Sequence, residues 1–155
     1  MKNSKLYSAI FGNELEKTFT LEQAITILES MDLINIGEVA EQAISAKSGV
    51  ERCSINTPDI DLVSGKQIKH ARTADKNGRR IAYCSIKNHT TDILCVVTER
   101  LTNKEYFFKF PNYAYGSMYG NTIGIPFYEN GVPYRNNRWW EYEVGSFEEL
   151  CELAK

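Results

Sequence analysis

The chain has 155 residues, 43% of them hydrophobic and 25% charged, which suits one domain with a sizeable core. Its formal net charge of -2 excludes a globally basic nucleic-acid binder, so any contact with DNA must come from local clusters. There is no apolar run of membrane-spanning length and no signal-peptide region. The four scattered cysteines form no CxxC pair and fit a reducing compartment, so a cytoplasmic protein is expected.

The first third of the chain has a helical pattern. Thr20 can cap a helix over residues 21–31, where apolar residues recur at helical spacing. Asn35 opens a second predicted helix, which ends at Ser48-Gly49 because glycine favours the conformation that stops a helix. Glu41 lies at the margin of the apolar stripe of this second helix.

From residue 52 onward the apolar residues follow strand patterns. The predicted strands are residues 52–63, 67–72, 79–87, 93–98 and 105–110. Asn77-Gly78 is a strong hairpin signal, and the continuously apolar segment 93–98 predicts a central strand covered on both faces. Ser146 and Glu149 form a capping-box pattern that opens a short final helix. The order predicts an α/β (α+β) fold in one domain over residues 1–155, with a single mixed β-sheet, N-terminal helices and a short C-terminal helix.

Two pairs of polar residues have the spacing of a catalytic site. Asp59 and Asp61 are two residues apart in one predicted strand, and Ser85 and Lys87 are two apart at the end of another, so each pair shares a face. Carboxylates are oxygen ligands that Mg²⁺ prefers, and a nearby lysine can position the attacking water and offset charge on a phosphate. The pattern predicts a Mg²⁺-dependent site that cleaves phosphodiester bonds.

A helix with Glu41, then Pro58-Asp59, then a strand that ends in Ser85-Ile86-Lys87, resembles the PD-(D/E)xK (restriction-endonuclease-like) nuclease superfamily. The resemblance covers residues 35–110 and implies a restriction-endonuclease-like core. It also implies that Asp59 binds metal, that Lys87 is the lysine of the motif and that Glu41 is the helix glutamate. Ser85 stands where the family usually has an acid, which leaves Asp61, on the same face as Asp59, as the candidate substitute metal ligand.

Each of these residues also has an ordinary structural explanation. Pro-Asp is a common turn dipeptide, and a lysine at a strand end or a glutamate on a helix is often only a solvated surface group. Glu38 and Glu51 are alternatives to Glu41 for the helix position. The nuclease interpretation gains weight because the residues occur in the order of the family and on the expected elements.

Two segments have residues suited to DNA contact. Basic residues of the hairpin can guide the phosphate backbone, and the segment 111–142 combines arginine and asparagine, which read base edges, with aromatic rings that stack on unpaired bases. The candidate DNA-binding residues are Lys66, Lys69, His70, Arg72, Arg135, Asn136, Asn137 and Arg138. Segment 111–142 has little periodicity, so long loops or an irregular hairpin are expected. Trp139, Trp140 and Tyr142 are expected to pack as a cover on the sheet or on a second subunit.

The sequence therefore predicts a metal-dependent DNA endonuclease of restriction, homing or phage type, with Mg²⁺ as its cofactor and Mn²⁺ as a substitute. Glu41, Asp59 and Asp61 would hold the metal, and Lys87 would lie beside the attacking water. Cutting both strands needs a second copy of so short a chain, so a homodimer or higher oligomer is expected. The alternatives are a non-catalytic nucleic-acid-binding protein of the same fold and an immunity- or antitoxin-like module that uses segment 111–142 as its interface.

Overall fold

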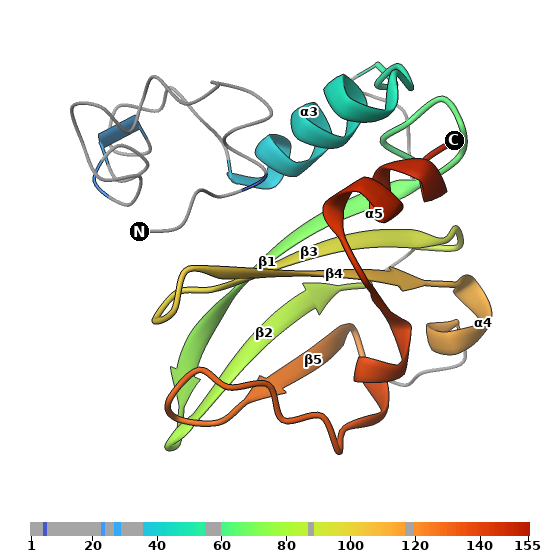
Figure 1. Cartoon of the computed structure of the whole chain (residues 1–155). Helices are drawn as coiled ribbons and strands as arrows, with labels where there is room; N and C mark the ends of the chain where they lie inside the picture. Colours follow the sequence, from blue (N-terminus) through green and yellow to red (C-terminus); the bar gives the residue numbers. More distant parts are fainter. Residues whose placement is uncertain are drawn as a thin grey trace.

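The computed structural model describes residues 5, 23, 27–28, 36–54, 60–86, 89–116 and 120–155. Its main feature is a six-stranded mixed sheet in the order β5-β2-β1-β3-β4-β6, with helices packed on it (Figure 1). The elements in chain order are α3 (Ile36–Ser48), β1 (Gln67–Lys76), β2 (Arg79–Ser85), β3 (Ile93–Glu99), β4 (Lys104–Phe110), α4 (Asn112–Tyr115), β5 (Thr122–Phe127), the 3-10 helix η2 (Arg138–Tyr142), β6 (Glu143–Val144) and α5 (Phe147–Leu153). The predicted α+β class with a single mixed sheet is confirmed.

The helix predicted from Asn35 is α3, and Gly49 follows it with a φ of 76°, the left-handed conformation that the stop signal requires. The helix predicted over residues 21–31 lies outside the described residues, apart from helical Gln23, Ile27 and Leu28. No helix among the described residues is long and apolar enough to cross a membrane.

The sheet is built around β3, which is buried along nearly its whole length, as predicted for a strand covered on both faces. It runs parallel to β1 on one side and antiparallel to β4 on the other. The turn between β1 and β2 is Asn77-Gly78, where both residues have positive φ, as the hairpin signal predicts. The pairing of β1 with β2 runs from Thr73↔Ala82 to Lys76↔Arg79, so it involves only the second half of β1.

Two predictions about strands were wrong. The single strand predicted over residues 52–63 is not formed, because the two ends of this segment pair with each other through an antiparallel bridge between Arg52 and Leu62, while residues 55–59 lie outside the described residues. Segment 111–142 was predicted to be irregular, but it contains β5, which pairs with β2 from Arg80 to Ser85. This strand was not predicted because it contains Gly124 and Pro126, and neither residue type favours a strand interior.

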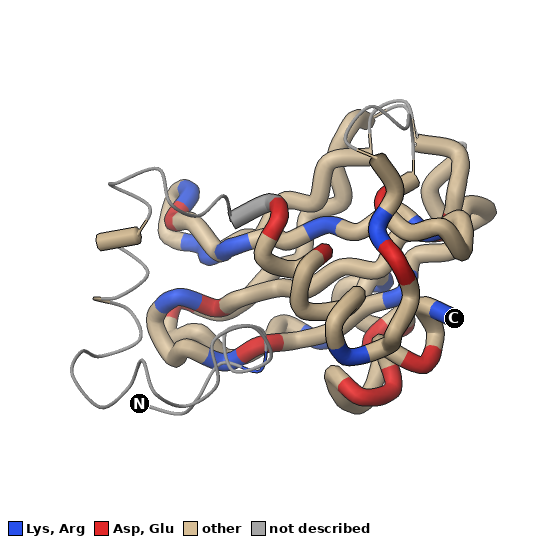
Figure 2. Tube along the Cα trace, turned by 90° about the horizontal axis from the view of Figure 1, so that it is seen from above, with Lys and Arg blue, Asp and Glu red and all other residues tan. Residues whose placement is uncertain are grey.

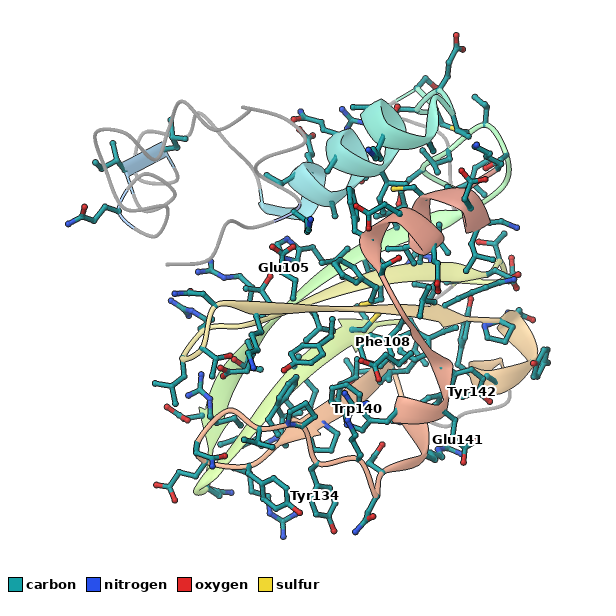
Figure 3. All side chains as sticks on the ribbon, viewed as in Figure 1. Glu105, Phe108, Tyr134, Trp140, Glu141 and Tyr142 are labelled. Carbon is teal, nitrogen blue, oxygen red and sulfur yellow. The ribbon has the colours of Figure 1, made fainter. Side chains whose placement is uncertain are left out.

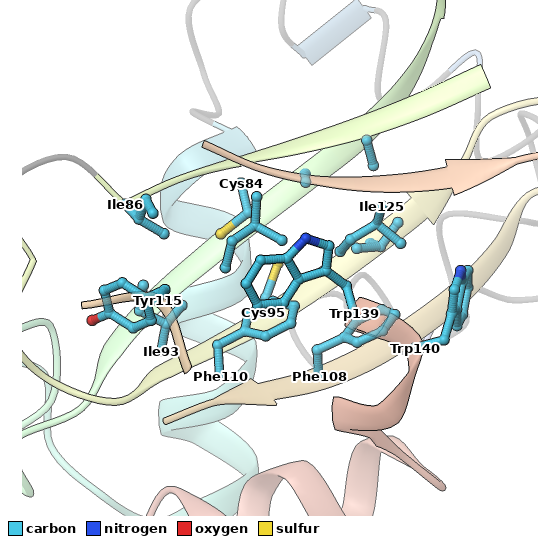
Figure 4. Close-up of a cluster of buried hydrophobic side chains, with 14 of the residues drawn as sticks. Cys84, Ile86, Ile93, Cys95, Phe108, Phe110, Tyr115, Ile125, Trp139 and Trp140 are labelled. Atoms are coloured by element: carbon cyan, nitrogen blue, oxygen red, sulfur yellow. The ribbon is translucent and has the colours of Figure 1, made fainter. Parts of the chain in front are cut away.

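The sheet separates two hydrophobic cores. On one face, α3 and α5 pack on β1, β3 and β4, with Ile44, Leu94 and Leu150 fully buried. On the other face lies an aromatic core in which Trp139 and Trp140 pack on the rings of β4 (Figure 4). These two tryptophans are buried and Tyr142 is partly buried against them, so the prediction that they cover the sheet is confirmed.

The predicted capping box opens α5. The Ser146 hydroxyl accepts a hydrogen bond from the Glu149 amide at 3.1 Å, while the Glu149 carboxylate reaches back one residue further, to the amide of Gly145. At the other end of α5, Ala154 is fully buried, and its carbonyl accepts a hydrogen bond from the hydroxyl of Ser64. The final helix is therefore tied to the turn that precedes β1.

Candidate active site

The candidate site lies at the start of β1. Residues 51–53 lie beside residues 61–63 as an antiparallel ribbon. The backbone amide of Cys53 donates a hydrogen bond to the carbonyl of Asp61 at 2.7 Å. The chain then turns through Ser64-Gly65, where Gly65 has a φ of 86°, and enters β1. This turn folds Asp61 back onto the edge of β1 that β2 leaves unpaired, and its carboxylate accepts a hydrogen bond from the amide of Ile68 at 2.7 Å.

Glu41 of α3 approaches Asp61 from the neighbouring helix. Its pKa is raised because the side chain is largely buried and because the negative charges of Asp61 and Glu38 are close, although the hydrogen bond from Arg52 opposes this rise. The guanidinium of Arg52 lies 2.9 Å from the Glu41 carboxylate. Two carboxylates that repel each other in a partly buried setting are an arrangement that a cation stabilises.

The first residues of β1, Gln67-Ile68-Lys69, lie beside Asp61 along the chain backbone. Ile68 packs into the core beneath α3, and by strand alternation Gln67 and Lys69 share the opposite face. Gln67 is buried, whereas Lys69 is half-buried. Because Asp61 is bonded to the amide between them, its carboxylate lies next to the backbone from which both side chains begin.

The donor set suits Mg²⁺ better than zinc. Among the described residues there is no group of three His, Cys, Asp or Glu side chains that could hold a metal ion. Mg²⁺ is often bound through one or two carboxylates and keeps several waters, so Glu41 and Asp61 fit it. In the structure, the guanidinium of Arg52 is the positive charge beside the Glu41 carboxylate.

The structure brings together only part of the predicted site. The charge of Asp61 contributes to the raised pKa of Glu41, whereas Asp59 and Lys87 lie outside the described residues, so the metal and catalytic roles of all four stay predictions. Ser85 is exposed at the end of β2, where it pairs with Thr122. Of the alternatives to Glu41, Glu38 is close enough to raise its pKa, whereas Glu51 is exposed on the ribbon.

Gln67 was missed as a site residue, and Lys69 was expected only to contact DNA. Their x-x-Lys spacing is that of the family motif, and they follow Asp61 directly after a Ser-Gly turn. A glutamine stands where that motif usually has an acid, so the sequence alone did not single out this segment. The turn and the hydrogen bond from the Ile68 amide to Asp61 place the segment beside a predicted metal ligand.

The other candidate DNA-binding residues have structural partners or lie at the surface. His70 Nε2 is 2.9 Å from the Thr98 hydroxyl. In segment 111–142, Arg135 is paired with Glu143 and stacks on Trp140, Arg138 stacks on Trp139 at 4.3 Å, and Asn137 caps η2 by accepting from the amide of Trp139. Lys66 and Arg72 are half-buried, and Asn136 is exposed. Acidic and basic positions intermingle over most of the described trace (Figure 2), so charge alone does not mark one face for DNA.

No protein-family model matches the chain, and no curated protein matches it. Among solved structures, the chain is similar to a bacterial homing endonuclease, I-Ssp6803I, with 20% identity and a TM-score of 0.41. The similarity covers 70% of this chain and 83% of that chain. At this level it assigns no role to any residue, so the candidate site rests on the contacts described above.

Asp61→Asn is expected to lower the pKa of Glu41 toward its ordinary value, because the substitution removes one of the negative charges that raise it. The measurement is a carboxyl-carbon NMR titration of both proteins. Asp75→Asn, at the far and exposed end of β1, is the matched control and should leave the pKa of Glu41 unchanged. The same Glu41 pKa in Asp61→Asn and the parent would show that the two carboxylates do not interact.

Proposed function

We propose that the protein is a Mg²⁺-dependent DNA endonuclease with a restriction-endonuclease-like core. Asp61 and Glu41 hold the metal, Gln67 occupies the position that is usually acidic, and Lys69 is the lysine of the site. The observation that carries this proposal is the hydrogen bond that seats the Asp61 carboxylate on the Ile68 amide, between Gln67 and Lys69, where the charge of Asp61 also contributes to the raised pKa of Glu41. The earlier prediction of Asp59 and Lys87 stays an alternative for the metal ligand and the lysine.

The bound metal would neutralise charge on the scissile phosphate and supply hydroxide near neutral pH. The Lys69 ammonium would donate hydrogen bonds to a phosphate oxygen and to the attacking water, and so offset charge that develops in the transition state. The hydrogen bond from the Ile68 amide fixes the Asp61 carboxylate before metal arrives. Arg52 would have to release Glu41, at least in part, for that carboxylate to reach the metal.

The pairing of Arg52 with Glu41 also favours a second candidate, a non-catalytic DNA-binding protein of the same fold. In that case the guanidinium permanently takes the place of the metal. Metal-dependent cleavage separates the two candidates. A nuclease with one such site per chain would act as a homodimer or higher oligomer to cut both strands of a duplex.

The test is nicking and linearisation of supercoiled plasmid DNA with Mg²⁺, with Mn²⁺ and with EDTA. The parent is expected to cut with either metal and to stop in EDTA, and Asp61→Asn is expected to cut at least about a hundredfold more slowly. Asp75→Asn, which keeps the same net charge as Asp61→Asn, should cut like the parent. Equal cleavage by Asp61→Asn and the parent would reject the site, and cleavage that persists in EDTA would reject the metal dependence.

A further inference from the structure

A groove of about 580 Å³ lies over β2 and β5, at the opposite end of β1 from the candidate active site. Its floor is formed by cross-strand pairs, Ile81 with Pro126 and Tyr83 with Gly124. Alternation along β1 and β2 places this floor on the sheet face that α3 and α5 cover further along, over β1, β3 and β4. Over β2 and β5 the same face carries the groove, and Tyr83 on its floor is exposed.

The groove is lined by exposed tyrosines. Tyr83, Tyr128 and Tyr134 are 41%, 50% and 39% exposed, although tyrosine rings usually bury most of their surface. The rings of Tyr128 and Tyr134 meet edge to face, with their centroids 5.1 Å apart. Tyr134 projects from the loop after β5 at the edge of the molecule (Figure 3). Gly124 leaves the ring of Tyr83 uncovered by a side chain, because a Cβ at position 124 would lie in van der Waals contact with that ring.

The wall formed by the loop 128–134 is held rigidly. The backbone amide of Tyr128 donates a hydrogen bond to the carbonyl of Val132 at 2.8 Å, and the backbone amide of Tyr134 donates to the carbonyl of Pro126 at 3.1 Å. Gly131, at a φ of 82°, lies so close to buried Glu99 that a Cβ would come within 2.6 Å of its carboxylate. The tyrosines are therefore presented by a fixed loop, which reduces the entropy lost when a ligand binds.

Positive charge borders the groove on its hairpin side. Arg79 is one of its lining residues, and it faces Lys76 across the hairpin. The Lys76 ammonium lies 5.3 Å from the centroid of the Tyr83 ring. The acidic side chain in the lining is Glu129, on the opposite wall. A ligand with a negatively charged backbone and flat, apolar faces complements this arrangement of ammonium, guanidinium and aromatic rings.

We propose that this groove binds unpaired nucleotides of a DNA strand, with bases stacked on Tyr83, Tyr128 and Tyr134 and phosphates bound by Lys76 and Arg79. The inference rests on the proposed function, since it takes DNA as the ligand of the protein. It adds a second contact region, separate from the candidate active site. With a rise of about 3.3 Å per residue, the ten residues of β1 separate the two regions by about 30 Å.

The test is fluorescence anisotropy with a labelled oligothymidine of about 12 nucleotides, in EDTA, so that binding is measured without cleavage. The parent is expected to bind it, and Tyr83→Ala and Tyr128→Ala are each expected to weaken binding about tenfold, while Tyr83→Phe keeps the ring and the affinity. Tyr113→Ala is the matched control, because Tyr113 is an 82% exposed tyrosine outside the groove. Circular dichroism checks that each variant is folded.

Three results would overturn the inference. They are a parent that does not bind the oligonucleotide, groove variants that bind as tightly as Tyr113→Ala, and groove variants that weaken binding to a blunt duplex as much as binding to the single strand. Its failure is distinguishable from failure of the nuclease proposal. Groove-dependent binding by a protein that never cuts plasmid DNA rejects the nuclease alone, whereas metal-dependent cleavage without groove-dependent binding rejects the groove alone.

Discussion

Lys69→Met is expected to lower the rate of Mg²⁺-dependent plasmid cleavage by between about a hundredfold and ten-thousandfold. The substitution keeps a long, unbranched side chain at a half-buried strand position and removes only the ammonium that would offset charge at the phosphate. Binding of duplex DNA in Ca²⁺ should weaken much less than cleavage does, because one phosphate contact contributes little to the whole interface. The readouts are single-turnover cleavage and anisotropy on the same preparations.

Lys87→Met is the variant to compare with Lys69→Met, since the family resemblance in the sequence assigned Lys87 as the lysine beside the attacking water. If Lys69 acts at the scissile phosphate, Lys87→Met should cut within a few fold of the parent. A full loss of cleavage in Lys87→Met, together with normal cleavage in Lys69→Met, would restore the original assignment. Asp59→Asn and Asp61→Asn distinguish the two metal assignments in the same way.

Arg80→Ala is expected to destabilise the protein by about 3–5 kcal/mol, because it leaves the buried carboxylate of Glu99 without its guanidinium. The Glu99 side chain is fully buried, and it accepts from Arg80 Nε at 2.6 Å, from the amide of Thr102 at 2.7 Å and from the hydroxyl of Thr73 at 3.0 Å. Urea unfolding measures the loss. Arg79→Ala, at the exposed neighbouring position, is the control and should change stability by less than about 1 kcal/mol.

The destabilisation caused by Arg80→Ala should become smaller at acidic pH. Burial raises the pKa of Glu99, but hydrogen bonds from Thr102 and Arg80 outweigh burial and hold that pKa below its ordinary value. A carboxyl whose pKa is depressed by folding stabilises fully above its unfolded pKa and loses this contribution as pH falls through the folded value. The difference in unfolding free energy between the parent and Arg80→Ala should therefore narrow in acid. A difference that widened in acid would contradict this account.

Local signals predicted the elements whose residues specify their own conformation. The end of α3 at Gly49, the Asn77-Gly78 hairpin and the Ser146 cap each depend on a few adjacent residues, and the structure has all three. The central position of β3 followed from its continuous apolar run. The strand β5 was missed because its formation depends on backbone hydrogen bonds to another strand, β2. Its own residues Gly124 and Pro126 give no local strand signal.

The candidate site could be predicted only in part, for a related reason. Asp61 was identified from its residue type and spacing and Glu41 from the family resemblance, and in the structure the charge of Asp61 contributes to the raised pKa of Glu41. The start of β1 was not recognised as part of the site, because Gln67 is not an acid. Only the backbone contact between Ile68 and Asp61 shows where that strand begins relative to the carboxylates.

The hydrogen bond from Ser64 to the Ala154 carbonyl links segments 90 residues apart. Ser64 belongs to the turn between Asp61 and Gln67, so the geometry of those two residues is clamped by the far end of the chain. Local opening of α5 would release that clamp while leaving the sheet paired. Amide hydrogen exchange in the turn and in α5 should therefore proceed through a shared opening event.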